Sequence, residues 1–312
     1  MTDDGRTVAV LMGGLSAERE VSLVSGEASA AALEGRGHAV VRVDVGPDLP
    51  RRLLDLRPAV VFNALHGRYG EDGRVQGLLD LLGIPYTHSG VLASALAMDK
   101  PMAKRVFASA GLRCPEGVEA DLASVLRYPP VAPPFVVKPA AEGSSVGVII
   151  VPGPDLRPLE ERNDLDLTQR VLVERFIPGR ELTCGVLDDE PLAVTEIRPR
   201  EGFYDYRAKY TEGFADHLVP APLPEALTRE VMDWALRAHR ALGCRGVSRA
   251  DFRYDPGEAG AGGGSSAGLY LLEVNTQPGM TPLSLVPEQA AHRGIAFADL
   301  VVRLLETARC DR

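Results

Sequence analysis

Strand-like and helix-like segments alternate through the first third of the chain, and this alternation constrains the fold more than any other feature. The runs "TVAVLMGG", "AVVRVDV" and "AVVFNAL" are apolar and rich in β-branched residues, and a helical pattern follows each of them. Strands separated by helices require crossover connections, which place the strands parallel in one sheet. We therefore predict a Rossmann-like parallel-sheet domain of the α/β class over residues 1–99.

Two polar loops follow the first and third of these strands. The stretch "GGLSAERE" leads into a helix with Ser16 as the expected N-cap and Gly35 as its end, and "HGRYGEDG" leads into another helix. Ligands usually bind at the carboxyl ends of parallel strands, where both loops lie. Taken alone, Glu18 is interpreted as complementing the helix dipole, and His66 as a hydrogen-bonded scaffold residue.

The alternation ends near residue 100, which predicts further structural units. Residues 100–180 combine one helix with strand-like runs, as is typical of a small α+β unit. Residues 181–312 contain short strands, a long helix at 225–243 and a final helical segment that begins at Pro287. The low-complexity stretch 257–268 separates the strands "SRADFRYD" and "GLYLLEVN", and we interpret it as a surface hairpin insertion.

Composition excludes several classes of function. The net charge is −9 and charges of both signs are mixed along the chain, which argues against a nucleic-acid-binding surface. There is no run of 18 apolar residues and no signal-peptide pattern, so we expect a cytoplasmic protein with no membrane segment. The four cysteines form no C-x-x-C pair, which indicates neither a zinc site nor a disulfide framework.

Lysine is scarce, and this scarcity is informative. Arginine supplies 30 of the 34 basic residues, and the lysines are Lys100, Lys104, Lys138 and Lys209. A compact, flexible ammonium group suits a phosphate, whereas arginine serves at most sites where a cation only needs to be solvated. We therefore treat the lysines as candidates for phosphate contacts.

Three oxygen-bearing residues lie on the last two predicted strands. Glu273 and Asn275 are two positions apart and so point to one face, and an antiparallel hairpin would bring Asp251 beside them. Hard oxygen donors in this number suit Mg²⁺, which completes its coordination with phosphate and water. An ordinary exposed strand face is the alternative, but the flanking "LYLLEVN" is too apolar for it.

The stretch "AEGSSVG" at 141–147 is a candidate phosphate-binding loop. Its glycines allow backbone N–H groups to turn onto phosphate oxygens, and Lys138 ends the preceding strand. The letters "GSSVG" also fit a nucleophile elbow with Ser145 as the nucleophile. That motif requires a helix next, whereas "VIIVPGP" predicts a strand, so a serine hydrolase is disfavoured.

The segment 199–220 is unusually aromatic for a loop. It holds Phe203, Tyr204, Tyr206, Tyr210 and Phe214, five of the 17 aromatic residues, together with Lys209. One interpretation is a lid that closes over a site, excludes water and brings Lys209 to a phosphoryl group. The alternative is aromatic packing of a long loop onto the domain below.

Taken together, these stretches resemble the D-alanine–D-alanine ligases of the ATP-grasp superfamily. The matching segments, in order, are "VAVLMGGLSAEREVSLVSG", "HGRYGEDGRVQG", "AMDK", "VVKPAAEGSSVG", "VERFIPGRELTCGV", "YDYRAKY", "GVSRADFRYD" and "LLEVNTQPGMTPLSLVP". They cover nearly the whole chain. Each is weakly specific alone, but eight in register are hard to attribute to coincidence.

The resemblance implies an ATP-grasp fold in three domains: a substrate-binding domain at 1–99, a central subdomain at 100–180 and a C-terminal domain at 181–312. ATP would lie between the last two. The residues near its phosphates would be Lys100, Lys138, Ser144, Ser145 and Lys209. Glu174 and the backbone near Phe176 and Ile177 would contact adenine, and Glu181 would contact the ribose. Asp251, Glu273 and Asn275 would bind two Mg²⁺ ions, with Mn²⁺ as an alternative metal. The sequence leaves a need for a monovalent cation open.

The implied reaction activates one D-alanine as an acyl phosphate, which the amine of a second D-alanine attacks. Its product is the D-alanyl-D-alanine used in peptidoglycan synthesis. In the family's pattern, Glu18 binds the ammonium group of the first D-alanine, Ser144 and Tyr210 are linked to Glu18, and His66 lies nearby. Arg249 stabilises the oxyanion of the tetrahedral intermediate, Lys209 the transferred phosphoryl group, and Ser284 the carboxylate of the second D-alanine. A homodimer is expected.

Two other functions stay open in the sequence: a related ATP-grasp ligase that uses D-lactate or another amino acid as its second substrate, and a non-catalytic nucleotide-binding protein. Relatives that make D-alanyl-D-lactate carry Phe at the position of Tyr210, so Tyr here favours an amine nucleophile over D-lactate. A non-catalytic nucleotide-binding protein would not need Glu18, Tyr210 and Arg249, all of which are present. The departures from the family pattern are the insertion at 257–268 and Pro282-Leu283 before Ser284.

Overall fold

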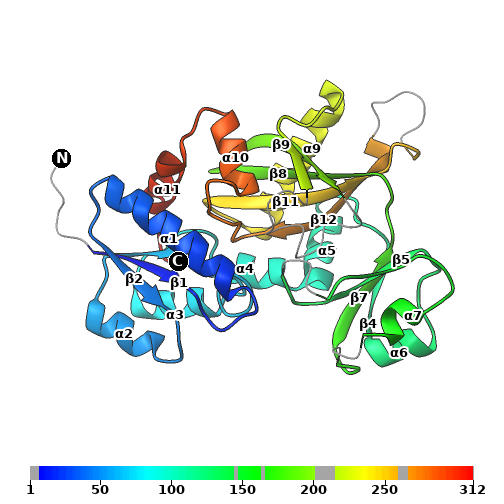
Figure 1. Ribbon diagram of the computed structural model, residues 1–312, viewed down its shortest axis with the longest axis horizontal. Coiled ribbons are helices and arrows are strands. Elements are labelled where there is room, and N and C mark those ends of the chain that lie inside the picture. Colours follow the sequence, from blue (N-terminus) through cyan, green and yellow to red (C-terminus); the bar gives the residue numbers. More distant parts are fainter. Residues whose placement is uncertain (1–6, 144–146, 163–165, 201–214, 259–265, 312) are drawn as a thin grey trace.

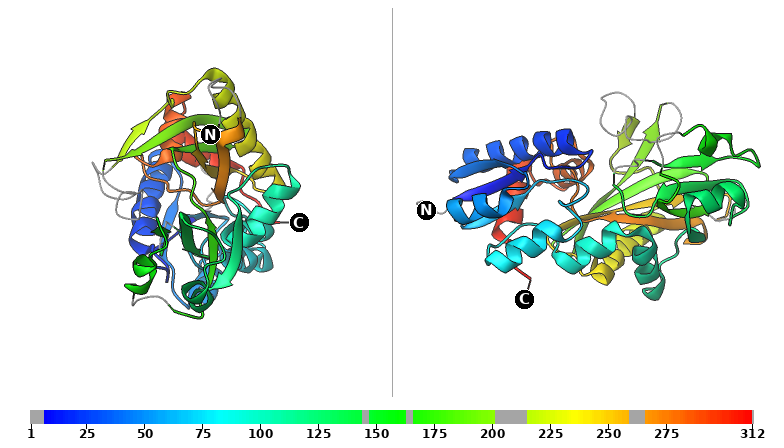
Figure 2. Two further views of the ribbon diagram at one scale, coloured as in Figure 1. Left: turned by 90° about the vertical axis from the view of Figure 1, so that its right-hand side faces the viewer. Right: turned by 90° about the horizontal axis from the view of Figure 1, so that it is seen from below.

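The computed structural model describes residues 7–143, 147–162, 166–200, 215–258 and 266–311. Within them, the strands form three separate sheets that follow one another along the chain (Figure 1). The molecule is elongated, with the first sheet at one end and the second at the other (Figure 2). The fold is mixed α/β and α+β, as predicted.

The first sheet is parallel, which confirms the prediction for the start of the chain. Its strands lie in the order β2-β1-β3, with β1 central. They are β1 (Val8–Met12), β2 (Val40–Asp44) and β3 (Val60–Asn63), and the accompanying helices are α1 (Arg19–Gly35), α2 (Leu49–Leu56), α3 (Arg74–Leu82) and α4 (Val91–Met98). Because the strands run in parallel, the loops after β1 and β3 meet at one edge.

The start of α1 differs from the prediction. The helix begins at Arg19 and its N-cap is Glu18, which makes no side-chain capping bond, so Ser16 is not the N-cap. The Ser16 hydroxyl instead donates to the His66 carbonyl (2.7 Å) and accepts from the Glu18 N–H (3.2 Å). Ser16 therefore connects the loops after β1 and β3. The predicted end of the helix at Gly35 is confirmed.

The second sheet is antiparallel, in the order β4-β7-β5-β6. Its strands are β4 (Gly117–Asp121), β5 (Phe135–Pro139), β6 (Ile149–Val151) and β7 (Arg170–Arg175). Two short helices, α6 (Leu122–Arg127) and α7 (Arg157–Glu160), add to the one helix that the sequence predicts for residues 100–180. Phe135, Val137 and Val173 of the sheet pack with Leu122 and Leu159 of these helices. Strand β6 follows "GSSVG", so the helix that a nucleophile elbow requires is not there.

The third sheet is also antiparallel, in the order β10-β9-β8-β11-β12. Its strands are β8 (Arg180–Leu187), β9 (Glu190–Pro199), β10 (Ala215–Leu218), β11 (Val247–Tyr254) and β12 (Leu269–Asn275). The helices of this region are α9 (Glu225–Leu242), α10 (Leu285–His292) and α11 (Phe297–Glu306), with a short 3₁₀ turn η1 (Ser266–Gly268). The final helical segment, predicted as one, is thus two helices, and it starts at Leu285.

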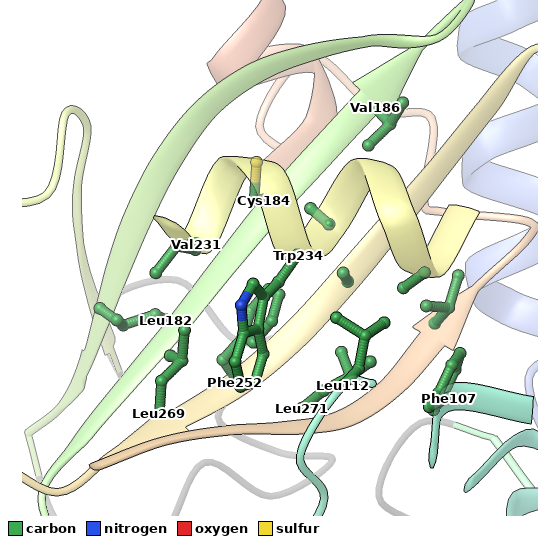
Figure 3. Close-up of a cluster of buried hydrophobic side chains, with 14 of the residues drawn as sticks. Phe107, Leu112, Leu182, Cys184, Val186, Val231, Trp234, Phe252, Leu269 and Leu271 are labelled. Atoms are coloured by element: carbon green, nitrogen blue, oxygen red, sulfur yellow. The ribbon is translucent and has the colours of Figure 1, made fainter. Parts of the chain in front are cut away.

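The hydrophobic cores join parts of the chain that are distant in sequence. Trp234 of α9 packs with Phe252 and Leu271 of the third sheet, and Phe107 of α5 (Lys100–Ser109) belongs to the same core (Figure 3). Helix α5 is thus part of the C-terminal core, although its place in the sequence groups it with the central unit. Helix α5 contacts α9 and β12, and only these tertiary contacts show that it belongs to the core of the third sheet.

The end of the chain returns to the first sheet. Helices α10 and α11 share a core with β1 and α1, and Figure 1 shows α11 beside α1. Tyr86 forms single β-bridges with Val61 and with Arg309. This packing holds the first and third sheets against one another. In the described part of the chain, no helix combines the length and apolar character needed to cross a lipid bilayer.

Candidate active site

The polar ends of β11 and β12 lie side by side. In the antiparallel ladder Asp251 is opposite Glu273, and Arg249 is opposite Asn275. The hairpin pairing predicted from the sequence is therefore confirmed. The side chains of all four residues are on the same face, because positions two apart in a strand share a face.

Hydrogen bonds orient two of the three candidate metal ligands. The Arg249 guanidinium donates two bonds to the Asp251 carboxylate (both 2.8 Å), and Thr183 Oγ1 donates a third (2.7 Å). Asn275 Oδ1 accepts the backbone N–H of Gln277 (2.8 Å). Two carboxylates and an amide oxygen form the hard donor set that Mg²⁺ prefers, so the residues fit this metal.

A cavity between the second and third sheets adjoins this strand end. Its lining includes most of the residues that the sequence places around a nucleotide, namely Lys100, Lys138, Glu174, Phe176, Ile177, Glu181, Asp251 and Glu273. Lys100 Nζ lies 3.7 Å from Glu273 Oε2 and also donates to the carbonyl of Glu142. Of the phosphate, base and metal residues that the family resemblance implies and the structure describes, all but Asn275 thus line one cavity.

Two lysines hold Glu174 at the floor of this cavity. Its carboxylate lies 2.5 Å from Lys138 Nζ and 2.6 Å from Lys104 Nζ. Burial raises the pKa of Glu174, but the two ammonium groups outweigh burial and hold it below the usual range. Burial likewise opposes the charge of Lys138, yet Glu174 and Glu273 raise its pKa overall. The scarcity of lysine made Lys104 a candidate phosphate contact, but Lys104 does not line the cavity and pairs with Glu174 instead.

Arg253 organises the rim of the cavity. Its guanidinium donates to the carbonyls of Ile177 (3.1 Å) and Gly179 (2.9 Å) and lies 3.5 Å from the Glu181 carboxylate. It also lies over the ring of Phe176 at 5.9 Å. Sequence reasoning missed Arg253, although its position two residues after Asp251 on β11 places it on the same strand face.

A second group of carboxylates lies where the loops after β1 and β3 meet the Gly-rich loop. Glu18 is 5% exposed and Glu71 is 8% exposed. The Gly67 N–H donates to Glu71 Oε1 (2.9 Å), and a Cβ added at Gly143 would lie only 2.8 Å from Glu18 Oε2. Burial and the charge of Glu18 raise the pKa of Glu71 well above its usual value. Sequence reasoning also missed Glu71. The feature that could have identified it is a carboxylate within a Gly-rich loop that follows a strand.

His66 is a buried, neutral imidazole beside this group. It is 6% exposed, its Nε2 lies 3.2 Å from Ser25 Oγ, and the backbone of Gln277 hydrogen-bonds its ring. Burial lowers its pKa to about 4, and the Gln277 contact only partly opposes this. At neutral pH His66 therefore contributes hydrogen bonds without charge.

The remaining predicted site residues are further away or not described. Ser284 is the N-cap residue of α10, where its hydroxyl lies 2.8 Å from Thr281 Oγ1 and accepts the Thr281 N–H at 3.1 Å. Ser284 is not part of the cavity lining. Ser144, Ser145, Lys209 and Tyr210 lie outside the described residues.

Comparison with known proteins points in one direction. The family model described as D-ala D-ala ligase C-terminus matches residues 115–306, and that described as D-ala D-ala ligase N-terminus matches residues 48–89. A D-alanine–D-alanine ligase from Cereibacter sphaeroides is 57% identical over 99% of this chain and 98% of its own length. One from Methylocella silvestris is 56% identical over 98% of this chain and 99% of its own.

A solved structure agrees with these matches. The D-alanine–D-alanine ligase from Bacillus anthracis complexed with ATP superimposes with a TM-score of 0.79 and is 33% identical, over 97% of this chain and 96% of that chain.

Proposed function

This chain belongs to the D-alanine–D-alanine ligase family, and we propose that it joins two molecules of D-alanine into D-alanyl-D-alanine, with conversion of ATP to ADP and phosphate. The fold is ATP-grasp, and the product is a peptidoglycan precursor. The observation that carries the proposal is the meeting of two sites at residues 142 and 143. Lys100 of the lysine-lined cavity donates to the Glu142 carbonyl, and a Cβ at the next residue, Gly143, would lie 2.8 Å from the buried Glu18 carboxylate.

The nucleotide would occupy the cavity between the second and third sheets. Lys100 and Lys138 would neutralise its phosphates, Glu174 and the backbone near Phe176 and Ile177 would contact adenine, and Glu181 would contact the ribose. The Lys104–Glu174–Lys138 ion pairs support this assignment, because they keep Glu174 ionised and its oxygens fixed as acceptors.

The ends of β11 and β12 would hold two Mg²⁺ ions through Asp251, Glu273 and Asn275, with Mn²⁺ as a substitute. Such ions neutralise phosphate charge during phosphoryl transfer. The contacts of Asp251 with Arg249 and Thr183 would keep its carboxylate in the orientation that metal binding requires.

The reaction has two chemical steps. A carboxylate oxygen of the first D-alanine attacks the γ-phosphorus, the bond to the β-phosphate oxygen breaks, and ADP leaves. The free amine of the second D-alanine then attacks the carbonyl carbon of the acyl phosphate, phosphate leaves, and the amine loses its proton. Catalysis rests on positioning and on neutralisation of developing charge.

The side chains around Glu18 would position the amino acids. Glu18 would bind the ammonium group of the first D-alanine, linked to Ser144 and Tyr210, with His66 nearby. Arg249 would stabilise the oxyanion, Lys209 the transferred phosphoryl group, and Ser284 the second carboxylate. The burial of Glu18 supports its part, since a carboxylate away from water binds an ammonium ion more strongly.

The test is ATP turnover with D-alanine, L-alanine and D-lactate, offered singly and in pairs, with products identified by mass. We expect D-alanyl-D-alanine and one phosphate per dipeptide. Phosphate release without any dipeptide from D-alanine would contradict the proposal. A product from the D-alanine and D-lactate pair alone would identify a ligase with a different second substrate.

The homodimer, the cytoplasmic location and the need for a monovalent cation stay predictions. Sedimentation measures the first, fractionation of the source cells the second, and turnover with K⁺ or Na⁺ as the added cation the third.

A further inference from the structure

Gln277 is a buried amide that joins the third sheet to the first. It is 1% exposed, and its partner Asn63, at the end of β3, is fully buried. The Asn63 side-chain amide donates to Gln277 Oε1 (3.2 Å), and Gln277 Nε2 donates to the Asn63 carbonyl. Both ends of the Gln277 amide therefore bind one residue, 214 positions away in the chain.

The backbone of Gln277 connects two parts of the site. Its N–H donates to Asn275 Oδ1 (2.8 Å), and its main chain also hydrogen-bonds the imidazole of His66. An amide oxygen has two lone pairs, so Asn275 can accept this bond and still ligate a cation. Gln277 thus contacts a candidate metal ligand on one side and a residue of the amino-acid pocket on the other.

Burial makes this arrangement sensitive to the Gln277 side chain. Asn63 is held in turn by bonds to the Leu65 N–H (3.2 Å) and the Gly70 carbonyl (2.9 Å), within the loop that carries His66. A buried polar group that loses its partner retains the full cost of leaving water, so Asn63 would be driven to find a new partner. The loop after β3 would then shift relative to the end of β12.

We propose that Gln277 is a positioning residue, which sets the place of the amino-acid pocket relative to the phosphate-binding end of β12. This inference rests on the proposed function, because it uses the roles proposed for Asn275 and His66. Gln277 would hold the first D-alanine, bound beside His66, so that its acyl phosphate meets the amine of the second D-alanine before water reaches it. Water attack on the acyl phosphate would return D-alanine and phosphate, with loss of the ATP and no dipeptide.

The test is Gln277→Met, which keeps the side-chain length and removes both amide hydrogen bonds. We expect more than one phosphate released per dipeptide. We also expect the KM for D-alanine to rise about tenfold, the change in affinity that loss of one buried hydrogen bond typically produces. The KM for ATP should not change, because Gln277 does not line the nucleotide cavity.

Ser248→Ala is the matched control. The Ser248 hydroxyl lies 2.7 Å from His239 Nδ1, is equally buried and belongs to β11, but its neighbour on the strand, Arg249, points to the opposite face. We expect this variant to lose stability and to keep one phosphate per dipeptide. If Gln277→Met does not fold, Gln277→Ser tests the same ratio. Water beside the smaller side chain can satisfy the buried groups of Asn63 and keep the fold, but the direct link between Asn63 and residue 277 is still lost.

The outcomes separate the two proposals. A wild-type protein that forms no dipeptide overturns the proposed function and this inference with it. A normal wild-type reaction, with one phosphate per dipeptide and an unchanged KM for D-alanine in Gln277→Met or Gln277→Ser, overturns the inference alone. A raised ratio in Ser248→Ala would also overturn it, because general loss of stability would then explain the effect.

Discussion

Asp251 and Glu273 face one another across the ladder between β11 and β12. The other end of that ladder, where Tyr254 pairs with Leu269, is three residues away along β11 and, because of a β-bulge, four along β12. The Gly-rich connection 257–268 joins the strands at that other end. The described ends of the two strands that lead into this stretch are thus not the ends that carry Arg249 and Asn275. At the opposite ends of the strands, Arg249 pairs with Asn275, whose Oδ1 accepts the Gln277 N–H (2.8 Å).

The first prediction concerns Glu273. Glu273→Gln should lower turnover by at least about 100-fold. Loss of a residue that only supports a metal ligand costs up to about 100-fold, and this variant removes a proposed ligand itself. The fold should persist, since Glu273 is only partly buried. Asp216→Asn is the control: Asp216 lies on β10 of the same sheet and pairs with the exposed Arg200. Wild-type rates for Glu273→Gln at limiting Mg²⁺ would rule out the metal site.

The second prediction concerns Lys104, whose ammonium group donates a hydrogen bond to the Glu174 carboxylate (2.6 Å). Lys104→Met should raise the KM for ATP about tenfold and leave the KM for D-alanine unchanged, because one buried charge-assisted hydrogen bond to Glu174 is lost. The exposed neighbour Arg105, whose contact is with Met102 Sδ (3.3 Å), supplies the control Arg105→Met. Equal effects on both KM values would point to general destabilisation.

The third prediction concerns Gly67, which has a positive φ of 69°. A Cβ at this position would collide with the Glu18 carboxylate, and the left-handed backbone itself costs about 1 kcal/mol for alanine. Gly67→Ala should therefore raise the KM for D-alanine and lower stability. Gly77→Ala, within α3, meets only Val91 Cγ2 at 3.9 Å and should be neutral or stabilising. Steady-state kinetics and thermal unfolding of both variants provide the measurement.

The fourth prediction concerns pH and His88. Burial lowers its pKa from 6.5 to about 3 in the folded protein, with His66 and Arg245 adding to the effect. Below pH 6.5 the unfolded chain binds more protons than the folded chain, so the free energy of unfolding falls as the pH is lowered towards 3.

His88→Asn isolates this contribution, because asparagine tolerates the left-handed backbone at this position (φ 70°). Relative to the variant, the wild-type protein should lose about 1.4 kcal/mol of unfolding free energy for each pH unit below its ordinary pKa. Urea denaturation of both proteins at a series of pH values measures the difference. Parallel stability curves would show that His88 does not titrate in this way.

Spacing within strands was the most reliable guide in the sequence. The two-residue separation of Glu273 and Asn275, and the hairpin with Asp251, follow from strand periodicity and were predicted correctly. Ser16 was assigned wrongly as an N-cap, because its hydroxyl is used by His66, a residue 50 positions away. A local signal cannot reveal a competing partner that only the folded chain supplies.

The sequence by itself determined the alternating strands and helices around the first sheet, the polar loops after β1 and β3, and the oxygen-bearing side chains that share one face at the end of β12. These depend on local periodicity and on residue types, which are readable along the chain. Only the tertiary structure decided that Lys104 binds Glu174, that Glu71 lies beside Glu18, and that Gln277 binds Asn63. Each is a long-range contact between buried polar groups, whose partners are set by how the sheets pack together and not by their neighbours in sequence.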